Sequence, residues 1–217
     1  VTTAKLSPET VRAFDTYVQK REQEIASRGR QRGFLWIAEQ REGLNATKEG
    51  ALVKPYATGA TTKAPDGLIH DWVGAVYIPA PLTRVLAFVK NYAHHQDFYK
   101  PEVLQSKVLS NQGDDFRIFL RLQKSKVITV VLDTEYDIRY MRLDANRVSS
   151  RSISTRIAEV ADPGTPKERV LPSGDDHGFL WRLNTYWRFA EQDGSTVMEC
   201  EAISLSHRDA VPTTARH

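Results

Sequence analysis

Residues 68–99 read LIHDWVGAVYIPAPLTRVLAFVKNYAHHQDFY, and this stretch decides the fold. Its first part, 68–78, is rich in β-branched and aromatic residues and is closed by Pro79 and Pro81, which is typical of a strand. The remainder repeats apolar residues at helical spacing on one face: Leu82, Val85, Leu86, Val89, Tyr92 and Ala93. Pro101 sets the latest end of this helix. The stretch therefore predicts a strand followed directly by a helix.

Downstream of this helix the sequence predicts strands only. The segments are 103–110, 116–123, 127–143, 147–160, 177–191 and 195–206. Most of their connections are short, as in NQGDD and QDG, so neighbouring strands are expected to pair antiparallel. Strands of this length have to twist and curl, and a curled sheet needs something to wrap around.

Upstream, the residues from Pro8 to Arg28 predict a helix that Ser7 can cap and Gly29 ends. Its apolar stripe is Val11, Phe14, Val18 and Ile25, with Tyr17 and Arg21 alongside. The residues that follow are harder to interpret. A short strand or helical turn at 33–39, an edge strand around Pro55 and a loop over 57–67 are expected there.

Composition excludes several classes of protein. Of the 217 residues 41% are hydrophobic and 26% charged, which indicates a globular chain. The formal net charge is only +3, and the densest basic run is Arg28, Arg30 and Arg32, so no nucleic-acid partner is expected. No stretch approaches the ~20 apolar residues of a membrane span. The lone Cys200 cannot form an internal disulfide and is expected to be a small buried hydrophobe.

The strand–helix opening, the hairpin series and the segment 177–212 together resemble the START-like superfamily, also called SRPBCC, of pollen-allergen-like and polyketide-cyclase-like proteins. The chain looks most like an uncharacterised bacterial subgroup of it. The resemblance implies an α+β helix-grip fold: a curled antiparallel sheet of about seven strands, with a helix after the first strand. The predicted division is an N-terminal helical extension over 1–67 and a START-like ligand-binding domain over 68–217.

The superfamily's sheet grips a long C-terminal helix, and this helix is expected to be absent here. Only HRDAVPTTARH follows Ser206, and eleven residues with a proline cannot supply several helical turns. Three explanations stay open: a truncated chain, a missing part of the polypeptide, or a substitute element such as the helix of Pro8 to Arg28.

The stretch 178–189, GFLWRLNTYWRF, is patterned on both faces of its predicted strand. One face is apolar, with Phe179, Trp181, Leu183, Trp187 and Phe189, and the other is polar, with Arg182, Asn184, Tyr186 and Arg188. Across the turn at Asp193-Gly194, Glu199 and Glu201 share one face of the partner strand, which predicts a ladder of opposite charges. If the polar face lines a cavity, Asn184 and Tyr186 are the functional residues; otherwise the tryptophans are. The predicted ligand-binding residues are Arg182, Asn184, Tyr186, Trp181, Glu199 and Glu201.

The expected function is binding or transport of an apolar small molecule, such as a lipid, a sterol-like compound or an aromatic metabolite. One alternative is a cyclase- or hydrolase-like enzyme, for which the candidate acids and bases are Tyr186, Glu199, Glu201, Asp133 and His177. Another is an interaction module whose apolar sheet face is covered by a partner chain. No catalytic residue is assigned, and an enzyme is the less favoured interpretation.

No cofactor or metal is expected. His94 and His95 with Asp97 invite a metal interpretation, but adjacent helical residues point about 100° apart and cannot easily share one ion. Stable membrane insertion is not expected, and the oligomeric state is left open. The chain begins at Val1, which favours a bacterial protein that is exported or periplasmic after loss of a signal peptide, with a cytoplasmic protein as the alternative.

Overall fold

A computed structural model describes residues 2–31, 33–55, 61–125 and 128–210. The helices are α1 (Pro8–Gln31), η1 (Ile37–Glu39), α2 (Gly43–Glu49), α3 (Leu82–Val89), η2 (Tyr92–His94) and α4 (His95–Phe98). The strands are β1 (Ala4–Lys5), β2 (Leu52–Pro55), β3 (Thr61–Ala64), β4 (Gly67–Ile78), β5 (Val103–Gln112), β6 (Asp115–Ser125), β7 (Thr129–Arg142), β8 (Arg147–Ala161), β9 (Arg169–Val170), β10 (Asp175–Asp176), β11 (Arg182–Gln192) and β12 (Ser195–His207). Across these described ranges no helix is both long and apolar enough to span a membrane.

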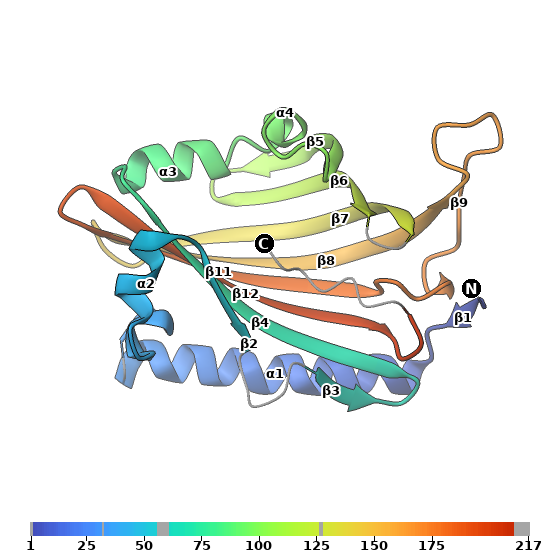
Figure 1. Cartoon of the computed structure of the whole chain (residues 1–217), viewed down its shortest axis with the longest axis horizontal. Coiled ribbons are helices and arrows are strands. Elements are labelled where there is room, and N and C mark those ends of the chain that lie inside the picture. Colours follow the sequence, from blue (N-terminus) through green and yellow to red (C-terminus); the bar gives the residue numbers. More distant parts are fainter. Residues whose placement is uncertain (1, 32, 56–60, 126–127, 211–217) are drawn as a thin grey trace.

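The seven predicted strands form one antiparallel sheet in the order β4-β12-β11-β8-β7-β6-β5 (Figure 1). The short strands β2 and β3 pair with β4, and β9 pairs with β8. The last strand, β12, therefore lies beside the first long strand, β4, with Trp72 opposite Ala202. The predicted α+β helix-grip fold, with a helix after the first long strand and a helix at the N-terminus, is confirmed.

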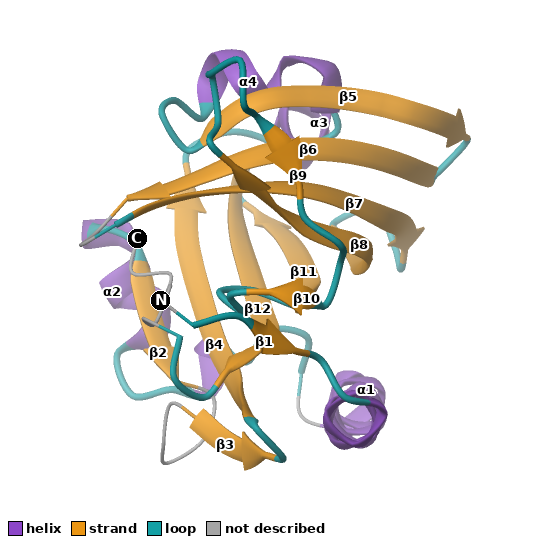
Figure 2. Ribbon diagram, turned by 90° about the vertical axis from the view of Figure 1, so that its right-hand side faces the viewer, coloured by secondary structure: helices purple, strands orange, loops and turns teal. Residues whose placement is uncertain are grey.

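Helices cover the two faces of the sheet differently (Figure 2). On one face, Phe14 and Val18 of α1 pack against Ile203 and Leu205 of β12. On the other face, α3 packs in a cluster that includes Phe189 together with Ile138 and Tyr140 of β7, while Met198 packs against it from the edge. We call these the α1 face and the α3 face. The same strands contribute side chains to both faces because a strand has a two-residue period, which sends neighbouring side chains to opposite faces.

Three local predictions were wrong. The helix after β4 is not continuous but breaks near Asn91 into α3, η2 and α4, and the break lets the Tyr92 hydroxyl approach that of Tyr140 at 2.5 Å. The expected loop over 57–67 contains β3, while 56–60 lie outside the described residues. Strand β11 begins at Arg182, because the chain turns at Gly178 with a φ of 71°.

The described residues after β12 end in a turn at Arg208–Ala210 and include no helix. Residues 211–217 lie outside the described part of the chain. The N-terminal helix does cover the sheet, but on the face opposite α3. The predicted division of the chain at residue 67 stays a prediction.

Candidate functional site

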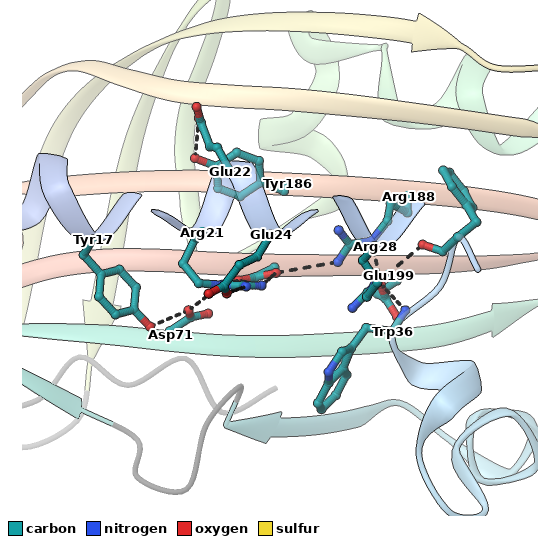
Figure 3. Close-up of polar contacts among 12 residues, drawn as sticks. Tyr17, Arg21, Glu22, Glu24, Arg28, Trp36, Asp71, Tyr186, Arg188 and Glu199 are labelled. Atoms are coloured by element: carbon teal, nitrogen blue, oxygen red, sulfur yellow. Dashed lines mark hydrogen bonds and ion pairs between the residues drawn. The ribbon is translucent and has the colours of Figure 1, made fainter. Parts of the chain in front are cut away.

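The α1 face buries a charged network between α1 and the strands β11, β12 and β4 (Figure 3). At one end, Arg188 donates through Nε to Glu199 Oε1 at 2.6 Å. The same carboxylate accepts the backbone N–H groups of Trp36 at 3.1 Å and Ile37 at 2.6 Å. Arg28 of α1 approaches it at 3.7 Å. Glu199 is therefore satisfied entirely from within the protein, as a buried charge requires.

The other end of the network joins α1 to β12 and β4. Arg21 donates to both carboxylate oxygens of Glu201, at 2.9 and 3.0 Å. It also approaches Asp71 at 3.5 Å and forms an ion pair with Glu24. The Tyr17 hydroxyl donates to Asp71 Oδ2 at 2.8 Å. A two-oxygen contact of this kind is among the stronger ion-pair geometries, so α1 is fixed in register on the sheet.

Burial shifts the proton affinities of this network. Desolvation, with the neighbouring charge of Glu201, raises the pKa of Asp71 to about 8. Burial and the hydrogen bond to Asp71 raise the pKa of Tyr17 far above its ordinary value. Desolvation lowers the pKa of Arg28, and the adjacent Arg188 charge lowers it further. The network therefore holds its charge balance in part by keeping a proton on Asp71.

Most of the predicted ligand-binding residues belong to this α1 face. Glu199 and Glu201 are both 0% exposed beneath α1. The Tyr186 hydroxyl donates to Glu22 of α1 at 2.8 Å, and Asn184 is buried on the same face, opposite Ile203. The predicted ladder is confirmed in its register, with Arg188 opposite Glu199 and Tyr186 opposite Glu201. These four residues meet protein groups, and their role in ligand binding stays a prediction.

The remaining two lie near the start of β11. Arg182 is half-buried and donates to the carbonyl of Trp181 at 2.9 Å. Trp181 precedes the strand, so it does not share a face with Trp187 as predicted but packs in the cluster with Phe14. Its indole N–H donates to Asp176 Oδ1 at 3.0 Å.

The candidate acids and bases for catalysis all have partners. Tyr186, Glu199 and Glu201 are held as described above. Asp133 accepts from Arg121 at 2.7 and 3.0 Å. His177 Nδ1 lies 2.7 Å from Glu159 Oε2, at the loop end of the sheet. In Tyr186, Glu199, Glu201 and Asp133 the side-chain oxygens are engaged in these contacts, whereas in His177 the printed side-chain contact is made by Nδ1.

The α3 face has the opposite character along β4, β12 and β11. We call its half-exposed side chains the apolar strip: Trp72, Val76, Met198, Cys200, Ala202 and Trp187. Gly74 and Thr185 complete the strip, and the register aligns Gly74, Cys200 and Trp187 in one row. Burial raises the pKa of the Cys200 thiol well above its ordinary range. In these three strands the charged side is closed and the apolar side is partly open.

Polar atoms border the strip. Trp72 Nε1, His70 Nδ1 and Ser150 Oγ are buried, and none has a hydrogen-bond partner within the described ranges. By contrast, Trp187 Nε1 donates to Thr185 Oγ1 at 3.1 Å. Ser150, Ser152 and Ser154 form a buried row on β8 beside β11. Burial lowers the pKa of His70, whose Nε2 lies 3.2 Å from Ser206 Oγ.

A separate groove of about 1060 Å³ lies on the α1 face, between α1 and strands β6 to β8. Tyr186 and Arg188 contribute to its floor. Its charged walls are matched in ion pairs: Arg117 with Asp137, Arg139 with Asp115, and Arg151 with Glu22. The groove therefore offers charges of both signs that already have partners.

Sequence reasoning missed the α1 half of the network and the role of Asp71. One signal was available, since Arg21 lies alongside the apolar stripe of α1, three residues after Val18. A charge at the edge of a buried stripe needs a buried partner.

The possible metal ligands near the end of the helical stretch do lie close together. His94 Nδ1 is 3.0 Å from Asp97 Oδ2, but both side chains are exposed. The part of the chain that the structure describes has no cluster of side chains suited to a metal ion.

No family model and no curated protein matches this sequence. Several solved structures are similar to the structure of this chain. The STAR-related lipid transfer protein of Xanthomonas axonopodis is similar at 14% identity and a TM-score of 0.48, over 71% of this chain and 86% of that one. The Zhui aromatase/cyclase from a Streptomyces species is similar at 13% identity and a TM-score of 0.41, over 66% and 71%. A START superfamily protein from Mycobacterium smegmatis is similar at 10% identity and a TM-score of 0.42, over 66% and 81%.

The similarity of this chain to these solved structures is a similarity of fold. Membership of a particular bacterial subgroup stays a prediction. The arrangement of strand, helix and six long antiparallel strands is that of the START-like, helix-grip fold, as the sequence predicted.

Proposed function

We propose that this protein binds an apolar small molecule against the apolar strip of the α3 face. One observation carries the proposal: in β4, β12 and β11 the charged side chains are closed beneath α1, while tryptophan, methionine and cysteine on the opposite face are half-exposed. A half-exposed strand ordinarily turns its polar side to water. The reversed arrangement is what a sheet needs if its open side meets an apolar ligand.

The energetics favour a covered strip. Apolar surface gains about 25 cal/mol per Å² when it leaves water, so a ligand covering roughly 200 Å² of the strip gains about 5 kcal/mol before the costs of association. The rigid indole rings of Trp72 and Trp187 offer large contact areas at low cost in conformational entropy. Lipids, sterol-like compounds and aromatic metabolites all fit this description.

The test is binding of Nile red, followed by its displacement with a lipid extract. Ala202→Trp places an indole in the open strip and is expected to weaken binding at least tenfold while leaving the fold intact. Ser149→Trp adds the same group in the groove on the α1 face and is expected to leave binding unchanged. Loss of binding in Ser149→Trp alone would place the ligand in the groove and contradict the proposal.

An interaction protein whose partner covers the strip is the competing interpretation. It predicts a well-folded protein that binds no Nile red as a monomer and exists as an oligomer by light scattering. That combination would also overturn the proposal.

A further inference from the structure

Three buried polar atoms border the apolar strip and have no partner among the described residues: Trp72 Nε1, His70 Nδ1 and Ser150 Oγ. All three belong to the α3 face, since Trp72 lies opposite Ala202 and Ser150 opposite Trp187. An unpaired buried donor or acceptor costs roughly 1–3 kcal/mol. Buried polar groups in proteins are nearly always satisfied, so atoms of this kind beside a partly open apolar surface ask for an external partner.

We propose, on the basis of the proposed function, that the ligand is an amphiphile whose apolar body lies on the strip and whose oxygen accepts the indole N–H of Trp72. Indole nitrogen is a donor only, so its complement has to be an acceptor such as a hydroxyl, carbonyl or carboxylate oxygen. A wholly hydrocarbon ligand would bury this donor without a partner. The chemistry at this end of the strip therefore selects oxygen-bearing ligands.

His70 lies at the same end of the apolar strip as Trp72 and offers a second polar contact to the ligand there. It lies two residues before Trp72 on β4 and on the same face, so the two side chains start roughly 7 Å apart. Because burial lowers its pKa, the ring is neutral near pH 7. A neutral ring beside a neutral indole needs no charged head group, so an uncharged hydroxyl satisfies the site.

Ser150 supplies a second contact. It lies on β8, three strands away from β4 in the order β4-β12-β11-β8, which is roughly 14 Å across the sheet, perpendicular to the strands. Its hydroxyl donates and accepts, so it suits a second oxygen of either kind. An elongated ligand with an oxygen at each end fits both contacts better than one with a single polar head.

The chain offers matched controls for both groups. Trp187 has the same indole N–H in the same strip, but it already donates to Thr185 Oγ1 at 3.1 Å. Ser154 is in the same serine row, but its Oγ already accepts the backbone N–H of Leu183 at 3.0 Å. Trp72→Phe and Ser150→Ala therefore remove unused groups, whereas Trp187→Phe and Ser154→Ala remove used ones.

The experiment measures displacement of Nile red by dodecane, dodecanol and the α,ω-dodecanediol. Wild-type protein is expected to bind in the order diol, alcohol, alkane, with about five- to tenfold between steps, the worth of one hydrogen bond. Trp72→Phe is expected to remove the advantage of the alcohol over the alkane. Ser150→Ala is expected to remove only the advantage of the diol over the alcohol. Trp187→Phe is expected to change all three affinities by the same factor.

The failures are distinguishable. If none of the three compounds displaces Nile red, the proposed function fails with the inference. If all three bind equally, or if Trp72→Phe keeps the preference for the alcohol, the strip binds apolar molecules and the amphiphile inference alone is overturned. A second readout needs no ligand: both tryptophans lose ring contacts on substitution by phenylalanine, but only Trp187 also loses a hydrogen bond, so Trp72→Phe is expected to lower the urea midpoint less than Trp187→Phe. An equal or larger fall in Trp72→Phe would mean that its indole N–H has a partner in the protein, which also overturns the inference.

Discussion

Arg188 and Glu199 face each other across β11 and β12 at 2.6 Å, and neither side chain has appreciable contact with water. The pair lies beneath α1, on the side of the sheet away from the apolar strip. Its role is therefore to hold the N-terminal helix and the segment around Trp36 on the sheet.

Removing one partner of the pair is expected to be costly. Glu199→Gln leaves the buried Arg188 with only the more distant Glu201, at 3.7 Å, as a counter-charge, and the free energy of unfolding is expected to fall by about 3–5 kcal/mol. Urea denaturation followed by far-UV circular dichroism measures it. Asp137→Asn breaks an exposed pair with Arg117 and serves as the control, with little change expected. Equal losses in the two variants would contradict a buried role for Glu199.

Asp71 is expected to make stability depend on pH. Its pKa is raised to about 8 in the folded protein, against an ordinary value near 4, so between these values the folded state binds a proton that the unfolded state does not. The stabilisation is therefore complete below pH 4 and is lost as the pH rises through about 8. Urea midpoints are expected to fall between pH 7 and pH 8.5 in the wild type, and less steeply in Asp71→Asn. An identical slope in both proteins would assign the effect to other groups.

Cys200 is a built-in reporter of the apolar strip because the chain has no other cysteine. Burial raises the pKa of its thiol, so little thiolate is present at pH 8. Its reaction with Ellman's reagent is expected to be at least tenfold slower than in the protein unfolded in urea. Bound dodecanol is expected to slow it further. Reaction as fast as in the unfolded protein would mean that the strip is fully open to water.

The docking of α1 is expected to depend on Phe14, which is 2% exposed between α1 and β12. Phe14→Ala removes a fully buried ring and is expected to cost about 3–5 kcal/mol of unfolding free energy. Phe88→Ala changes a ring that is 45% exposed on α3 and is expected to shift stability by no more than about 0.5 kcal/mol. A small loss in Phe14→Ala would mean that the helix is held mainly by its ion pairs.

The sequence was sufficient to predict the long strands, the α1 helix and the register of β11 on β12. These features follow from local periodicity, as the alternation of Tyr186 and Arg188 with Trp187 illustrates. What packs on each face could not be predicted, because it depends on contacts between distant segments. Arg21 and Glu201 meet only in the folded chain, and the same alternation at β11 would suit either face toward a ligand.

The local errors have local causes. Gly178 interrupts a run that reads as one strand, so Trp181 leaves the face that alternation assigned to it. Asn91 interrupts a run that reads as one helix. That Trp72 Nε1 has no partner among the described residues leaves no signature in the sequence, because it depends on which groups the folded chain brings near the indole.

The pairing of Arg21 with Glu201 also sets an order of events during synthesis. The two residues are 180 positions apart, and Trp72 of β4 is 130 positions from its partner Ala202 in β12. Contacts this distant in sequence slow folding, since a long loop has to close before they form. Until β12 has been synthesised, Arg21 lacks Glu201, the carboxylate to which it donates two hydrogen bonds. We therefore expect α1 to dock late in folding, after β12 has paired with β4 and brought Glu201 into place.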